Sequence, residues 1–132
     1  MSSVLGLNVK EREEVQLLEK GEHEFEVQNA EARDLDKGKS GRISVICAPK
    51  GVKGADPIFH PLWYPSEEDT ARQRNNKRQA IEDFIKALGL KVKPNEVDLD
   101  EWKGCSFTAL VDIESDEEYG DRNVISEVIL PR

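Results

Sequence analysis

The sequence predicts an all-β fold, a five-stranded Greek-key barrel with one capping helix, on three observations. Five segments alternate apolar and polar residues with the period of a β-strand. One segment, between the third and fourth of these, has helical apolar spacing instead. The chain has 132 residues, which suits a single domain with one core. Residues 1–21 carry weak signals and are expected to form an N-terminal arm, so the domain is expected to span residues 22–132.

The first three strands are predicted at residues 23–32, 42–48 and 58–64. In the first of them Phe25 and Val27 alternate with polar residues, as in a strand with one buried face. The alternation slips after Gln28, which indicates a β-bulge. In the third, Pro61 is typical of an edge strand or a bulge, because proline has no N–H to donate to a neighbouring strand.

The helix follows the third strand. Ser66 is expected to be its N-cap, with Asp69 three residues further on and acidic residues filling the first turn. Its apolar stripe consists of Ile81, Phe84, Ile85 and Leu88. Gly89 suits a left-handed helix end, with Leu90 placed for a Schellman contact. If the helix plugs one open end of a barrel, only its second half needs apolar residues.

One helical turn is then expected near residues 98–103, followed by strands at residues 105–114 and 122–130. Cys47 and Cys105 are expected within strands as small buried thiols, without a disulfide, because one strand would separate the two strands that carry them. The resulting order, β-β-β-α-β-β, is that of the OB-fold, a small Greek-key barrel.

Composition and charge exclude several classes of protein. No apolar run approaches the roughly 18 residues of a membrane span, and no signal peptide is visible, so a cytoplasmic protein is expected. No metal-ligand spacing, nucleophile motif or phosphate loop is present, so we expect neither an enzyme nor a cofactor. The net charge of −8 argues against an indiscriminate polyanion binder. The charge is polarised, however: residues 33–54 hold six cations against two acids, and residues 105–132 hold two cations against seven acids.

Several short motifs, taken in their order, resemble a known family. They are Gly21-Glu22 before the first strand, Lys39-Ser40-Gly41 before the second, Ala87-Leu88-Gly89 at the helix end, Gly104 before the fourth strand and Asn123-Val124 in the fifth. Over about residues 17–131 the chain resembles phage-encoded OB-fold single-stranded-DNA-binding proteins, a family first described as a phage domain of unknown function. The resemblance implies DNA binding without sequence preference in phage replication or recombination. It also implies a location in the host cytoplasm and replication or recombination proteins as further partners. The loop Ser115–Asp121 departs from the family because it is unusually acidic for a loop that faces DNA.

Single-strand binding requires cations that follow the phosphates and aromatic side chains that stack on bases. OB-folds supply both from strands 2 and 3 and the adjoining loops. The predicted nucleic-acid-binding residues are therefore Lys37, Lys39, Arg42, Lys50, Lys53, Phe59, Trp63 and Tyr64. Because Pro61 can shift the register, either Phe59 and Trp63 or His60 and Tyr64 face outward. The lysines of the first loop equally suit a solvated turn.

Two further points stay open in the sequence. Four helix cations are either a solvated, salt-bridged face or a secondary contact for DNA or a protein; they are Arg72, Arg74, Lys77 and Arg78. Trp102 is expected to pack at the barrel rim. The alternative function is an OB-like protein-interaction module, including an acidic mimic of nucleic acid that acts on a host enzyme. The charge of −8 favours this alternative, and the basic segment 33–54 disfavours it.

Overall fold

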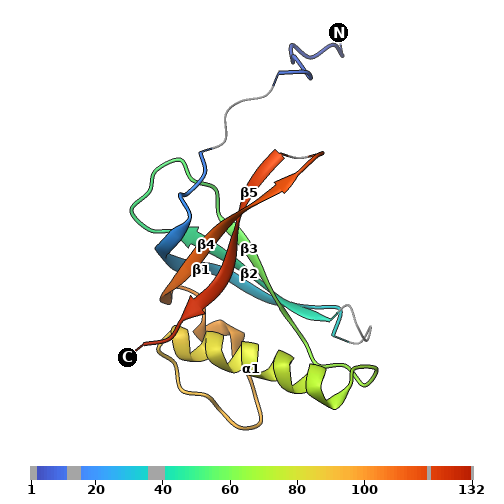
Figure 1. Ribbon diagram of the computed structural model, residues 1–132. Helices are drawn as coiled ribbons and strands as arrows, with labels where there is room; N and C mark the ends of the chain where they lie inside the picture. The colour runs from blue at the N-terminus through green and yellow to red at the C-terminus, as the bar shows by residue number, and fades with distance from the viewer. Residues whose placement is uncertain (1–2, 12–15, 36–40, 119, 132) are drawn as a thin grey trace.

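The computed structural model describes residues 3–11, 16–35, 41–118 and 120–131, which form one antiparallel sheet with a helix packed against it (Figure 1). The strands are β1 (Gly21–Arg33), β2 (Arg42–Pro49), β3 (Ile58–Trp63), β4 (Ser106–Asp116) and β5 (Gly120–Ile129). Helix α1 (Ala71–Ala87) and the short 3-10 helix η2 (Leu99–Glu101) lie between β3 and β4. The predicted order of elements is confirmed. No helix in the described part of the chain is long and apolar enough to cross a membrane.

The sheet has the strand order β3-β2-β1-β4-β5 with every neighbouring pair antiparallel, which is a Greek-key arrangement. The terminal strands β3 and β5 run in the same direction and approach each other, but no hydrogen-bonded ladder joins these two described strands. The predicted barrel is therefore not closed. The Tyr64 N–H donates to the Gly41 carbonyl of the neighbouring chain segment at 2.9 Å. Because the backbone N–H and C=O groups of successive strand residues point to opposite edges, those of Phe59, Pro61 and Trp63 point to the free edge of β3. Pro61 has no N–H to offer there, so one of the donors for a ladder with β5 is missing.

A β-bulge in β1 sets which of its residues face the core. Val27 pairs with Cys47, but the next register pair is Asn29 with Ile46, so Gln28 is the extra residue. Before the bulge, Phe25 and Val27 are buried, and beyond it Ala30 packs against the core. The slip in the sequence after Gln28 therefore marks a true change in pairing.

The core lies between the sheet and α1, with Phe84 at its centre. The Phe84 ring centroid is 5.1 Å from those of Trp102 and Phe107, and 5.8 Å from that of His60. The whole predicted helix stripe is buried, as is Trp102, which packs against Phe84. These contacts join β3, β4 and the η2 turn to one helical side chain. Figure 1 shows α1 lying across the end of the sheet that is opposite the N-terminal segment.

The C-terminal end of α1 agrees with the prediction, but its N-cap residue does not. Its N-cap is Thr70, not Ser66: the Thr70 hydroxyl accepts from the Gln73 N–H, and the Gln73 side chain accepts from the Thr70 N–H. Ser66 instead begins a separate turn that Asp69 closes, so the acidic residues precede the helix. The C-terminal end is as predicted. Gly89 has φ +75°, and the Leu90 N–H donates to the Ile85 carbonyl in a Schellman motif.

The chain joins the core earlier than residue 22. Leu18, within the segment expected to be an arm, is buried. The Asn123 side chain holds it from β5, because its amide N–H donates to the Leu18 carbonyl and its oxygen accepts from the Leu18 N–H. Residues 3–11 lie outside this anchor and stand off the body of the molecule (Figure 1).

Both cysteines are free, as predicted. Cys47 is buried in β2, but Cys105 lies one residue before β4 and is only half-buried, so its expected place within a strand was wrong. Val27 lies between them, paired with Cys47 in the sheet and donating its N–H to the Cys105 carbonyl at 2.9 Å.

Replacing Phe84 with alanine should destabilise the fold by about 3–5 kcal/mol, because a fully buried ring at the centre of the core is lost. Arg72→Ala, on the exposed first half of α1, serves as the control and should change the free energy of unfolding by less than about 0.5 kcal/mol. Urea denaturation of both variants measures the difference. Equal losses would mean that α1 does not anchor the core.

The two thiols should differ in reactivity. Burial raises the pKa of Cys47 to about 12, so its reactive thiolate is scarce in the folded protein. Cys105 is half-buried, and its Sγ donates to the Glu101 carbonyl at 3.2 Å. A thiol reagent at neutral pH should label Cys105 in the native protein and Cys47 only after unfolding, as peptide mass spectrometry would show. Equal labelling of both in native conditions would contradict the burial of Cys47.

Candidate nucleic-acid interface

The third strand presents two aromatic side chains to solvent. Phe59 and Trp63 are 49% and 46% exposed, whereas Ile58 and Leu62 are buried. His60 faces the core, where its ring lies against Phe84 and burial lowers its pKa. Of the two alternatives that the sequence left open, Phe59 and Trp63 are the outward pair of β3.

Cross-strand pairing places these aromatics beside residues of β1 and β2. Two rows of directly paired residues cross the three strands: Arg33–Arg42–Trp63 and Asn29–Ile46–Phe59. Directly paired residues share a face, so these six form one surface, which we call the outer face. A shallow hollow of about 340 Å³ lies on it, bounded by β1, β2 and Phe59.

The bulge at Gln28 brings Arg33 to this face. Without the extra residue, the alternation that buries Phe25 and Val27 would also turn Arg33 toward the core. Sequence reasoning missed Arg33 and Ile46 as site residues. The slip after Gln28 was the signal that could have found Arg33, because a bulge reverses the facing of every later residue in the strand.

Both guanidinium groups on the outer face lie near carboxylates of the same hairpin. Arg33 is 2.6 Å from the Glu31 carboxylate, and Arg42 is 3.8 Å from that of Asp34. All four side chains are substantially exposed, so these pairs are worth at most about 1 kcal/mol each. An incoming phosphate can therefore exchange with the carboxylates, but it must compete with them.

The remaining predicted residues do not all join this surface. Lys50 lies beyond the end of β2, where its ammonium group is 3.1 Å from Glu24 and donates to the Ser106 hydroxyl. Lys53 is exposed in the loop between β2 and β3. Tyr64 follows β3 and lines a separate groove beside α1. Lys37 and Lys39 lie outside the described residues.

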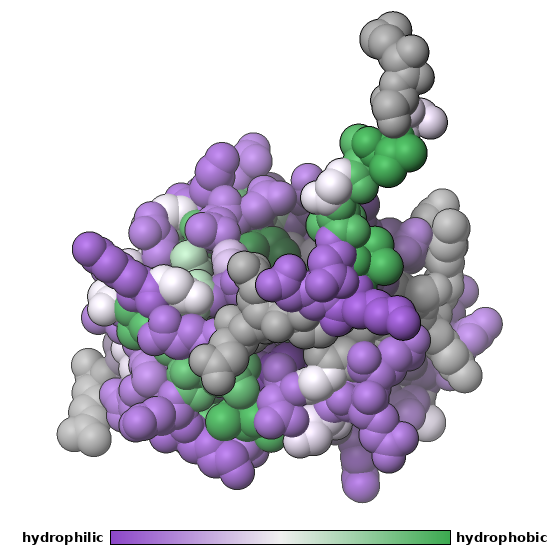
Figure 2. All heavy atoms as spheres, turned by 90° about the horizontal axis from the view of Figure 1, so that it is seen from above, coloured by the Kyte–Doolittle hydropathy of each residue, from purple (hydrophilic) through white to green (hydrophobic). Residues whose placement is uncertain are grey.

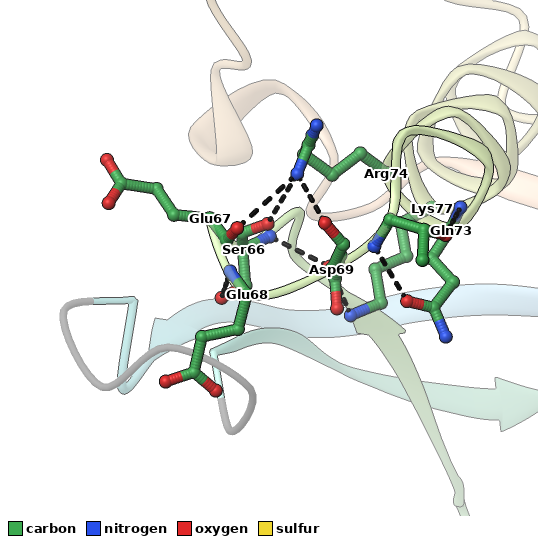
Figure 3. Close-up of polar contacts among 8 residues, drawn as sticks. Ser66, Glu67, Glu68, Asp69, Gln73, Arg74 and Lys77 are labelled. Atoms are coloured by element: carbon green, nitrogen blue, oxygen red, sulfur yellow. Dashed lines mark hydrogen bonds and ion pairs between the residues drawn. The ribbon is translucent and has the colours of Figure 1, made fainter.

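Two of the four helix cations brace the turn before α1 (Figure 3). The Arg74 guanidinium donates to the backbone carbonyls of Ser66, Glu67 and Asp69. The Lys77 ammonium lies 2.8 Å from the Asp69 carboxylate, which also accepts from the Ser66 N–H at 2.9 Å. The first half of the helix is thus not a simple overhang into solvent, because its cations hold the chain that enters it.

The other two helix cations are more accessible. Arg72 is exposed, and Arg78 is exposed with a long hydrogen bond of 3.5 Å to the Asn75 side chain. Of the four helix cations predicted as a secondary contact, Arg72 and Arg78 are therefore the more exposed pair.

Comparison with known protein families and with curated protein sequences finds no match for this chain.

The Asp69 turn should make stability depend on pH. The hydrogen bond from Lys77, and then that from the Ser66 N–H, hold the pKa of Asp69 below its usual value of 3.8. A carboxylate with a lowered folded-state pKa stabilises the fold fully above its usual pKa, and this contribution disappears as the pH falls through the folded-state value. Asp69→Asn should therefore destabilise the protein at pH 7, and the difference from the parent should shrink steadily below about pH 4.

Glu67→Gln is the matched control, since it removes a carboxylate from the same turn while Arg74 uses only the Glu67 carbonyl. Thermal melts of the parent and both variants between pH 2 and pH 7 provide the measurement. A destabilisation by Asp69→Asn that stays constant across this range, or one that Glu67→Gln reproduces, would contradict the role of the Asp69 carboxylate.

Proposed function

We propose that this protein is an OB-fold protein that binds single-stranded DNA without sequence preference through the outer face. The observation that carries the proposal is the exposed pair Phe59 and Trp63, set beside Arg42 on neighbouring strands. The Greek-key order with a helix between β3 and β4 supports the OB-fold assignment, and the face lies on the strands that OB-folds use for oligonucleotides.

The mechanism combines stacking with phosphate pairing. Phe59 and Trp63 are four residues apart on one strand, about 13 Å, so they offer two separate platforms for bases. Each stacked base contributes about 1–3 kcal/mol, whatever its identity, because every base has an aromatic face. Arg33 and Arg42 pair with phosphates by releasing Glu31 and Asp34, and their planar guanidinium groups suit phosphate oxygens.

Acidic side chains beside this face limit where a DNA strand can lie. Glu22, Glu24 and Glu26 are exposed along the first half of β1, and the β4–β5 hairpin carries most of the acids of residues 105–132. A polyanion is repelled from both regions. With the resemblance in the sequence, this favours a role in phage replication or recombination, where the acidic hairpin contacts a basic partner such as a replication or recombination protein.

A second candidate function is a protein-interaction module or an acidic mimic of nucleic acid. The observation that favours it is that Arg33 and Arg42 already face carboxylates, which leaves little excess positive charge among the described residues of the outer face. The two functions differ in their response to single-stranded DNA, because a phosphate binder binds it with an affinity that falls linearly with the logarithm of salt concentration.

Two variants separate stacking from phosphate pairing. Trp63→Ala should weaken binding to oligo-dT by about 1–3 kcal/mol and leave the salt dependence unchanged. Arg42→Ala should weaken binding to all single-stranded sequences alike and lower the slope of log affinity against log salt by about 0.7. Fluorescence anisotropy of labelled oligonucleotides at several salt concentrations measures both effects.

Lys91→Ala, which removes an exposed cation from the loop after α1, is the charge-matched control and should leave the slope unchanged. Tryptophan emission gives an independent check, since Trp63 is exposed and Trp102 is buried. Oligo-dT should quench the tryptophan emission of the parent protein but not that of the Trp63→Phe variant. If the parent binds no oligonucleotide, or if Trp63→Ala and Arg42→Ala both bind like the parent, the interaction-module function is the better one.

A further inference from the structure

The N-terminal segment carries the most exposed apolar side chains of the described chain. Val4, Leu5, Leu7 and Val9 are between 68% and 84% exposed, whereas every other large apolar residue is less than half exposed in the part of the chain that the structure describes. We call residues 3–11 the apolar arm. In Figure 2 it stands away from the body, with hydrophobic residues near its base among largely polar surroundings. Single exposed apolar residues are ordinary, but four within nine residues are close enough for one partner to bury them together.

A second apolar surface lies beside α1. The end of β1, the segment after β3, the helix and the loop that follows it enclose a groove of about 630 Å³. Its apolar rim consists of Leu35, Tyr64 and Val97, each between 39% and 43% exposed. Ile81 and Ile85 of the helix form part of its floor. We call this surface the helix groove.

The two surfaces lie at opposite ends of the molecule. In Figure 1 the arm leaves the end of the sheet that is remote from α1. The helix groove is lined by residues of α1 and of the segments beside it, so it lies at the other end. An arm that fills the groove of another copy makes a contact between two different patches. Such a heterologous contact repeats from copy to copy and builds a row instead of a closed pair.

We propose that the apolar arm of one copy docks in the helix groove of the next. The small apolar area that the arm can bury explains why this contact by itself is weak. A buried Val or Leu side chain contributes about 60–120 Å² of apolar surface, so the four supply roughly 250–500 Å². Even with an equal area from the groove, the total stays below the roughly 1,200–2,000 Å² of a stable interface. Neighbouring copies therefore associate mainly where a shared strand already holds them together. This last consequence rests on the proposed DNA binding, and the contact itself does not.

Disulfide trapping tests the contact without DNA. All variants carry Cys105→Ser, which removes the half-buried native thiol. Protein with Leu7→Cys is mixed with protein carrying Val97→Cys, and the mixture is oxidised under mild conditions. The yield of the disulfide-linked heterodimer should exceed the yield of either homodimer. The control replaces Val97→Cys with Lys103→Cys, an exposed position outside the groove. Equal heterodimer yields from the two mixtures, or no heterodimer from either, would overturn the proposal.

A single chain with both Leu7→Cys and Val97→Cys distinguishes docking between copies from docking within one. Oxidation should give a ladder of linked oligomers, because each copy has one donor and one acceptor. A monomer closed by an internal bridge as the main product would overturn the proposal in favour of an arm that folds back on its own groove.

Binding to DNA of two lengths then tests the consequence. The double variant Leu5→Ser, Leu7→Ser should bind an oligo-dT of single-site length within twofold of the parent. It should bind a long oligo-dT at least about 10-fold more weakly, because linked contacts can raise apparent affinity by 10²–10⁴-fold. Equal affinities of parent and variant for the long strand would overturn the cooperative role. Failure of the parent to bind either length would instead count against the proposed function and leave the trapping result standing.

Discussion

The packing of Phe84 into the sheet is the contact on which the rest of the fold depends. The sheet is not closed by hydrogen bonds between β3 and β5, so its curvature has to be held by side chains. Phe84 does this by contacting His60 on β3, Phe107 on β4 and Trp102 after η2. Pro61 removes one donor from the free edge of β3, and the helix, which contacts both β3 and β5, takes the place of the missing ladder. With His60 and Leu62 held inward, Phe59 and Trp63 have to face solvent.

The distribution of cations follows from the same packing. Two of the four cations on the first half of α1 anchor the turn that precedes the helix. Arg74 and Lys77 satisfy the carbonyls and the carboxylate of that turn, whereas Arg72 and Arg78 remain exposed. Within the described chain, the positive charge of residues 33–54 is also largely paired. The outer face is thus better described as aromatic with exchangeable ion pairs than as a basic patch.

Much of this architecture could be predicted from local patterns. The alternation of five strands, the slip after Gln28, the helix stripe around Phe84 and the left-handed end at Gly89 all depend on near neighbours in the chain. The predicted N-cap residue, Ser66, was wrong because two pairs of residues with the spacing of an N-cap and its partner occur within a few positions. Ser66 with Asp69 and Thr70 with Gln73 have the same spacing, and Lys77 and Arg74 from the helix draw Asp69 into the turn.

The sequence by itself determined the order of elements, the core stripe and the residue types that can stack on bases or pair with phosphates. Only the tertiary structure decided which of them meet. Arg33 and Arg42 come from one hairpin and Trp63 from the following strand, and they become neighbours through the register of three strands, which local periodicity does not specify. The tertiary structure also decided that Lys50 and Tyr64 lie outside the outer face and that the barrel stays open. These outcomes depend on cross-strand pairing and on packing against α1, and both are long-range contacts that no short stretch of sequence encodes.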